Sequence, residues 1–86
     1  MAVSRILPGR LYRFSDNAHV TMWETHSCTS RTECVQRVKE GDVLLILGHV
    51  RERVTSGDWW MHVLCNGTHG YVKKIWVRGR MSEVQS

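Results

Sequence analysis

The chain has 86 residues, of which 42% are hydrophobic and 23% charged, and its formal net charge is +4. This length supports one compact core, so we expect a single domain over residues 1–86. The composition argues against a disordered chain. No stretch approaches the roughly eighteen apolar residues of a membrane span. The cations are dispersed along the sequence, so the positive charge favours acidic partners only mildly.

Five segments are rich in β-branched and aromatic residues and are bounded by turn residues, which predicts strands. In chain order they are Arg10–Phe14, His19–Glu24, Asp42–Arg51, Asp58–Cys65 and His69–Val72. Before the third, Thr32–Lys39 is the only candidate for a helical turn, and it is too short to be stable alone. The polar ends outside residues 9–78 should be flexible. The expected fold class is all-β, a small five-stranded barrel whose closure removes exposed sheet edges.

Two sequences predict the turns between these strands. Asn66-Gly67 separates two of the segments, and this pair accepts the positive φ angles of a two-residue type I′ turn. Lys-Glu-Gly-Asp at residues 39–42 precedes an apolar run and predicts a turn that leads into a strand buried along most of its length.

Alternation along the strand before Asn66 divides its side chains between two faces. One face should carry Trp60, His62 and Leu64, and the other Trp59, Met61, Val63 and Cys65. The spacing of His62, Cys65 and His69 resembles a set of zinc ligands. Since His62 and Cys65 should point to opposite faces, we expect no metal site there.

The cysteines indicate a reducing compartment. Cys28, Cys34 and Cys65 are an odd number, which fits reduced thiols better than a disulfide framework. The N-terminus lacks the apolar core of a secretory signal. We therefore expect a cytoplasmic protein without membrane attachment, and a Cys28–Cys34 bridge remains an alternative under oxidising conditions.

Three pieces of sequence, in this order, resemble the Src-homology-3 (SH3) family. Leu11–Phe14 resembles its Ala-Leu-Tyr-Asp-Tyr strand, Gly41–Val43 its Lys-Gly-Asp turn, and Trp59-Trp60 with Gly70–Val72 its last hairpin. The long segment 15–38 and the Asn-Gly-x-x-Gly-Tyr-Val sequence at 66–72 are similar to bacterial relatives of SH3 domains. The resemblance covers roughly residues 9–77. It implies an SH3-like barrel that acts as a non-catalytic binding module, in a bacterial or phage regulatory or adaptor protein.

The same resemblance implies a platform that binds a protein or peptide partner. Its members would be Tyr12, Phe14, Trp60, Trp76 and Lys73. Counting back from Gly70 through the turn assigns Trp60 to the family's binding tryptophan, and a difference of one residue would assign Trp59. Lys73 stands where the family has a proline, which argues against proline-motif ligands. The alternative for each aromatic residue is a packing role in a small core.

A second function is suggested by the basic segment Lys73–Arg80, which contains a tryptophan. Small barrels bind RNA or single-stranded DNA by stacking bases on aromatic rings while cations neutralise phosphates. The residues concerned would be Lys73, Lys74, Trp76, Arg78 and Arg80. No catalytic or phosphate-loop motif is present, so we expect neither an enzyme nor a cofactor. Protein or peptide binding is the preferred interpretation.

Overall fold

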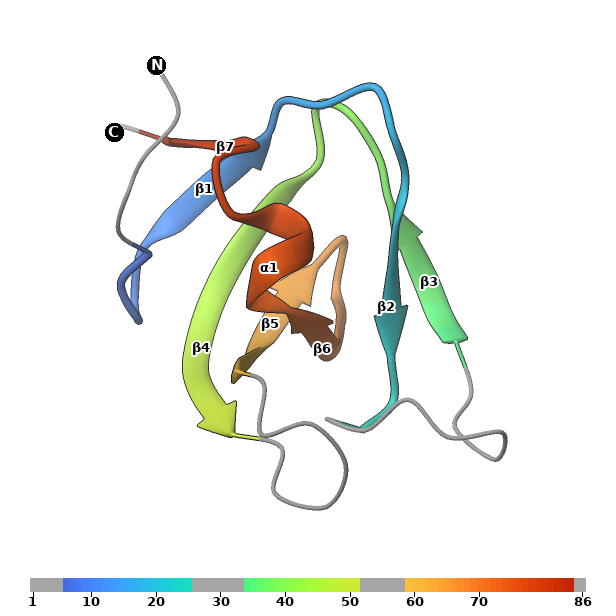
Figure 1. The fold of residues 1–86 in the computed structure, drawn as a ribbon, viewed down its shortest axis with the longest axis vertical. Coiled ribbons are helices and arrows are strands. Elements are labelled where there is room, and N and C mark those ends of the chain that lie inside the picture. The colour runs from blue at the N-terminus through green and yellow to red at the C-terminus, as the bar shows by residue number, and fades with distance from the viewer. Residues whose placement is uncertain (1–5, 26–33, 52–58, 85–86) are drawn as a thin grey trace.

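The computed structural model describes residues 6–25, 34–51 and 59–84, which form one antiparallel sheet and one short helix (Figure 1). The strands are β1 (Leu11–Phe14), β2 (Val20–Trp23), β3 (Cys34–Val38), β4 (Val43–Arg51), β5 (Trp59–Cys65), β6 (Thr68–Lys73) and β7 (Met81–Glu83), and the helix is α1 (Lys74–Val77). Their order across the sheet is β3-β2-β6-β5-β4-β1-β7. The predicted all-β class is confirmed.

The five predicted strands correspond to β1, β2, β4, β5 and β6, and two further strands were missed. The segment expected to form a helical turn contains β3, which pairs with β2 from Val20↔Val38 to Trp23↔Cys34. The expected flexible tail contains β7, which pairs with β1 and buries Met81 completely. Both expectations were wrong because each strand depends on pairing that local composition does not reveal: β3 pairs with the strand before it, and β7 pairs with β1 at the other end of the chain.

The sheet curls around a core to which its strands contribute alternate side chains. Buried and partly exposed residues alternate in β1 and β2, as the pleat of a strand requires. In Figure 1, α1 lies on the open side of the curved sheet, against β5 and β6. Within the described residues the sheet has two edges, β3 and β7, so the five-stranded closed barrel is not confirmed.

Both predicted turns are present. Asn66 has φ 53° and Gly67 φ 79°, and Cys65 pairs with Thr68, so the β5–β6 hairpin has the expected type I′ geometry. In the turn before β4, the Asp42 amide donates to the Lys39 carbonyl over 3.0 Å. The Asp42 carboxylate accepts from the Lys39 amide, also over 3.0 Å, which closes the turn from both sides.

The alternation predicted for β5 is confirmed in the second half of the strand. Met61, Val63 and Cys65 are buried, whereas His62 and Leu64 between them are partly exposed. The first two residues depart from the simple pattern, because Trp60 is fully buried and Trp59 is half exposed.

The β2–β3 hairpin crosses β6 at Gly70, where there is no room for a side chain. A Cβ atom on Gly70 would lie 2.9 Å from the Trp23 carbonyl oxygen, 2.9 Å from Val35 Cγ2 and 3.1 Å from Met22 Cε. The neighbouring pair Trp23↔Tyr71 is the only residue pair that joins β2 to β6 in the described residues. The absence of a side chain at Gly70 therefore allows the hairpin to join the sheet.

Replacing Gly70 with alanine should consequently destabilise the protein, by about 1–3 kcal/mol, because backbone atoms must move to admit the methyl group. Gly48→Ala is the matched control, since a Cβ there meets nothing within 4 Å. The free energy of unfolding of both variants can be measured by chemical denaturation. Equal stabilities would show that the close crossing at Gly70 is not a constraint.

Candidate partner-binding surface

The structure places three of the predicted platform residues in the interior. Tyr12 is 1% exposed, and Phe14 and Trp60 are 0% exposed. The Tyr12 hydroxyl accepts a hydrogen bond from the Leu7 amide over 2.8 Å, which fixes its ring inside the fold. Tyr12 and Phe14 are the alternate side chains of β1 that face the core around which the sheet curls, so a partner cannot reach them. These three aromatic residues pack the interior, so they do not form the exposed platform that we expected from the sequence.

Trp60, Lys73 and Trp76 nevertheless lie together in one cluster. The Trp60 and Trp76 rings meet edge to face with their centroids 5.5 Å apart. The Lys73 ammonium lies 5.6 Å from the Trp60 ring and 5.5 Å from the Trp76 ring, within the range of a cation–π interaction. Lys73 is also the cross-strand partner of Trp60. The cluster holds α1 against the sheet and leaves Trp76 partly exposed.

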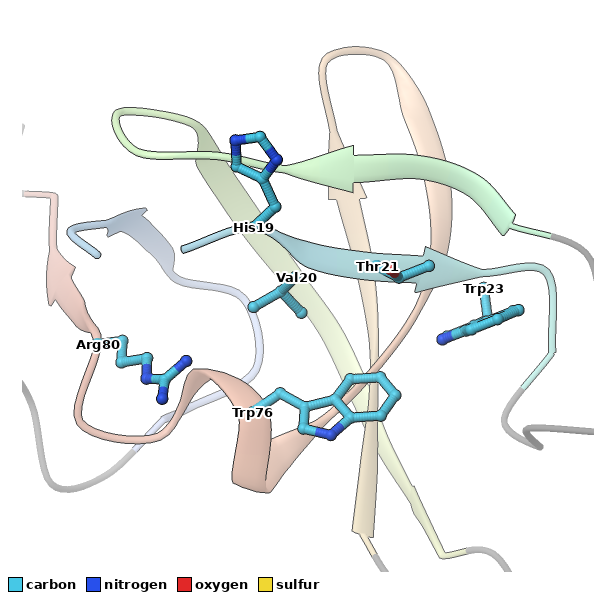
Figure 2. Close-up of a pocket in the computed structure, with 6 residues that line it drawn as sticks. All are labelled: His19, Val20, Thr21, Trp23, Trp76 and Arg80. Carbon is cyan, nitrogen blue, oxygen red and sulfur yellow. The ribbon is translucent and has the colours of Figure 1, made fainter. Parts of the chain in front are cut away.

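One side of α1 borders a hollow of about 260 Å³ (Figure 2). It is lined by His19, Val20, Thr21, Trp23, Trp76 and Arg80. Figure 2 shows the Trp23 ring from β2 facing the Trp76 ring from α1, with Arg80 at the far end. Arg80 pairs with Asp16, with 3.2 Å between Nε and Oδ2. We call this space the β2–α1 hollow.

The other side of α1 borders a second hollow, of about 210 Å³, which we call the β5–α1 hollow. Trp59, Lys74, Ile75 and Arg78 line it. Trp59 is 50% exposed and Ile75 is 72% exposed. The Arg51 guanidinium lies 6.0 Å from the centre of the Trp59 ring. Trp59 is therefore the accessible member of the tryptophan pair. From the sequence, the platform position is assigned to Trp60, and to Trp59 only if the count through the turn differs by one residue.

The five residues predicted for nucleic-acid binding are divided between the two sides of α1. Trp76 and Arg80 line the β2–α1 hollow, whereas Lys74 and Arg78 line the β5–α1 hollow. Lys73 lies between the Trp60 and Trp76 rings. The residue that sequence reasoning missed is Trp23, since no local signal shows that the β2–β3 hairpin carries it to α1.

The histidines and cysteines form a separate arrangement on β5 and β6. His62 Nε2 lies 3.3 Å from His69 Nδ1, and the His62 ring stacks on Tyr71 with centroids 4.6 Å apart. Cys65 is buried, so it does not join these histidines, and burial raises the pKa of its thiol. Among the described residues, no group of three potential ligands is placed to hold a metal ion. Cys34 is an exposed free thiol, and Cys28 lies outside the described residues, as does its proposed bridge.

Comparison of the chain with protein-family models, curated proteins and solved structures finds no match. In the ranges that the structure describes, no helix is long and apolar enough to cross a membrane. The functional interpretation consequently depends on the two hollows beside α1.

The histidine pair predicts a loss of stability in mild acid. Burial, together with the neighbouring His69, lowers the pKa of His62 below its ordinary value. The folded state therefore binds this proton less readily than the unfolded state does. The stability from neutral His62 is complete above about pH 6.5 and is lost as the pH falls through the folded pKa. His62→Gln should flatten this decline between about pH 7 and 5.

The measurement is the free energy of unfolding at a series of pH values. His19→Gln serves as the control, because His19 lies outside the pair. The proposed effect of His62 is refuted if the wild type and His62→Gln lose stability in parallel.

Proposed function

We propose that this protein is a non-catalytic binding module of the SH3-like kind that recognises an extended protein or peptide segment across α1. The observation that carries the proposal is the ridge formed by α1, which has a hollow with an aromatic wall on each side. Both hollows are smaller than the roughly 300–1,000 Å³ of small-molecule pockets. Their size suits single side chains of a peptide that crosses the ridge.

Tryptophans at the surface, of which Trp59 is exposed and Trp23 and Trp76 are partly exposed, supply the anchors for such a segment. A buried aromatic side chain contributes a large contact area for little loss of conformational freedom, so such residues dominate interfaces. Trp59 anchors the β5–α1 hollow, and Trp76 with Trp23 forms the walls of the β2–α1 hollow. Trp60 has an indirect role, since it supports Trp76 from below.

The sequence resemblance supports the SH3-like part of this proposal. The Asn66-Gly67 hairpin joins β5, which begins with the tryptophan pair, to β6, which contains Gly70-Tyr71-Val72. This agrees with the order of pieces that resemble the bacterial relatives. The proposal extends to a regulatory or adaptor role in the cytoplasm of a bacterium or in a phage-infected cell.

Binding of RNA or single-stranded DNA is a second candidate function, favoured by the β5–α1 hollow. Lys74 and Arg78 lie beside the exposed Trp59 and Ile75, and neither cation has an ion pair among the described residues. An exposed indole beside such cations can stack a base and neutralise a phosphate.

Trp59→Ala separates a contact role from a structural one. Peptides selected from a random display library on the wild type should lose about 2 kcal/mol of binding free energy or more, because an anchor is removed. The melting temperature of each variant shows that it is folded, which is needed because half of Trp59 is buried. Leu11→Ala is the matched control, because Leu11 is an exposed apolar residue that lines neither hollow.

The same variants distinguish the second function by fluorescence anisotropy with a single-stranded oligonucleotide. A nucleic-acid site would show affinity that falls steeply between about 50 and 200 mM salt. The slope would then flatten in Lys74→Ala and Arg78→Ala. That result, together with no selected peptides, would replace peptide binding by nucleic-acid binding.

A further inference from the structure

The polar side chains of His19, Thr21, Trp23 and Arg80 line the β2–α1 hollow, and each of them can donate a hydrogen bond. Arg80 supplies a guanidinium group, and Thr21 a hydroxyl that can donate. None of the six described residues that line the hollow is an aspartate or glutamate. An arginine or lysine of a partner would therefore meet Arg80 without a compensating carboxylate from the lining, whereas an acidic side chain would meet its complement.

One donor of this hollow is a buried indole N–H. In the described part of the chain, the indole Nε1 of Trp23 is buried and has no hydrogen-bond partner. Figure 2 shows its nitrogen edge turned toward the space between Thr21 and Trp76. A buried donor without an acceptor is costly, and an acceptor brought by a partner, with a small rotation of the ring, would relieve this cost.

Arg80 already binds one carboxylate at its outer side. Its Nε atom pairs with Asp16 at the rim, and both side chains are substantially exposed. A guanidinium group has five N–H donors, so the Nη atoms retain donors for a second carboxylate. In Figure 2 the guanidinium end of Arg80 extends from the rim toward Trp76 and Val20, into the hollow.

We propose, on the basis of the function proposed above, that the β2–α1 hollow receives a carboxylate side chain, and that the recognised segment is therefore an acidic peptide. The carboxylate pairs with Arg80 at one end of the hollow, the apolar neighbours of that residue pack on Trp76, and a second acceptor of the same segment, such as a backbone carbonyl, accepts from the Trp23 indole at the other end.

The experiment selects peptides from a random display library on the wild type and on Arg80→Gln. Wild-type selections should be enriched in Asp or Glu next to an aromatic or aliphatic residue. For one such synthetic peptide, Arg80→Gln should weaken binding about tenfold or more, and so should Glu→Gln in the peptide. Combining both changes should weaken binding little further than either alone, because they remove the same contact.

Arg10→Gln is the matched control. Arg10 is also an exposed arginine in an ion pair, with Glu83 over 2.7 Å, but it lines neither hollow. Its affinity for the peptide should equal that of the wild type, and the melting temperatures of both arginine variants show whether they fold.

The outcomes separate this inference from the function on which it depends. If the wild type selects neutral or basic peptides, or if Arg80→Gln and Arg10→Gln weaken binding equally, the acidic ligand is refuted while peptide binding stands. If no peptides are selected, both are refuted. If a single-stranded oligonucleotide displaces the selected peptide from the wild type but not from Arg80→Gln, phosphate replaces carboxylate as the ligand group.

Discussion

The close contact of the β2–β3 hairpin with Gly70 is the constraint on which the candidate surface depends. With hydrogen in place of a side chain at this position, the Trp23 carbonyl and the Val35 side chain can lie directly over β6. This contact brings β2 near α1, so that Trp23 and Trp76 face one another across a hollow. Without it, α1 would still follow β6, but the hollow would lack one wall. Gly70 thus determines where the β2–β3 hairpin lies, and through it which side chains line the β2–α1 hollow.

The adjacent residues Trp59 and Trp60 differ in their roles: Trp60 packs in the interior, whereas Trp59 lies at the surface. Trp60 is buried against Trp76, and Lys73 lies near both rings, so this unit stabilises the position of α1. Trp59 lies at the start of β5 and remains half exposed. A domain of this length has few large side chains for its interior, so some aromatic residues that look suited to recognition must instead complete the packing.

Much of the fold could be predicted from local sequence, but the surface could not. The strands β1, β2, β4, β5 and β6 have strong local composition, and Asn66-Gly67 specifies its turn through backbone conformation alone. β3 depends on its pairing with β2, β7 on its pairing with the distant β1, and the place of Trp23 beside α1 on the path of the hairpin. Tyr12 and Phe14 are buried because they lie on the face of β1 that points into the core of the curled sheet, and local sequence does not show that curl. Residue type predicted an aromatic and basic site, and only the topology showed which aromatic residues are accessible.

The single residue pair between β2 and β6 has a consequence for the motions of the molecule. β5 pairs along its length with β4 on one side and with β6 on the other, whereas Trp23↔Tyr71 is the one cross-strand residue pair between β2 and β6 in the described residues. Opening a lightly joined unit requires less free energy than unfolding the whole chain. The β2 wall of the β2–α1 hollow therefore belongs to the strand pair with the fewest cross-strand residue pairs in the described sheet, β2 with β6. An occupant that contacts both walls fastens the hairpin to the rest of the sheet, so its affinity includes the conformational entropy that the hairpin loses.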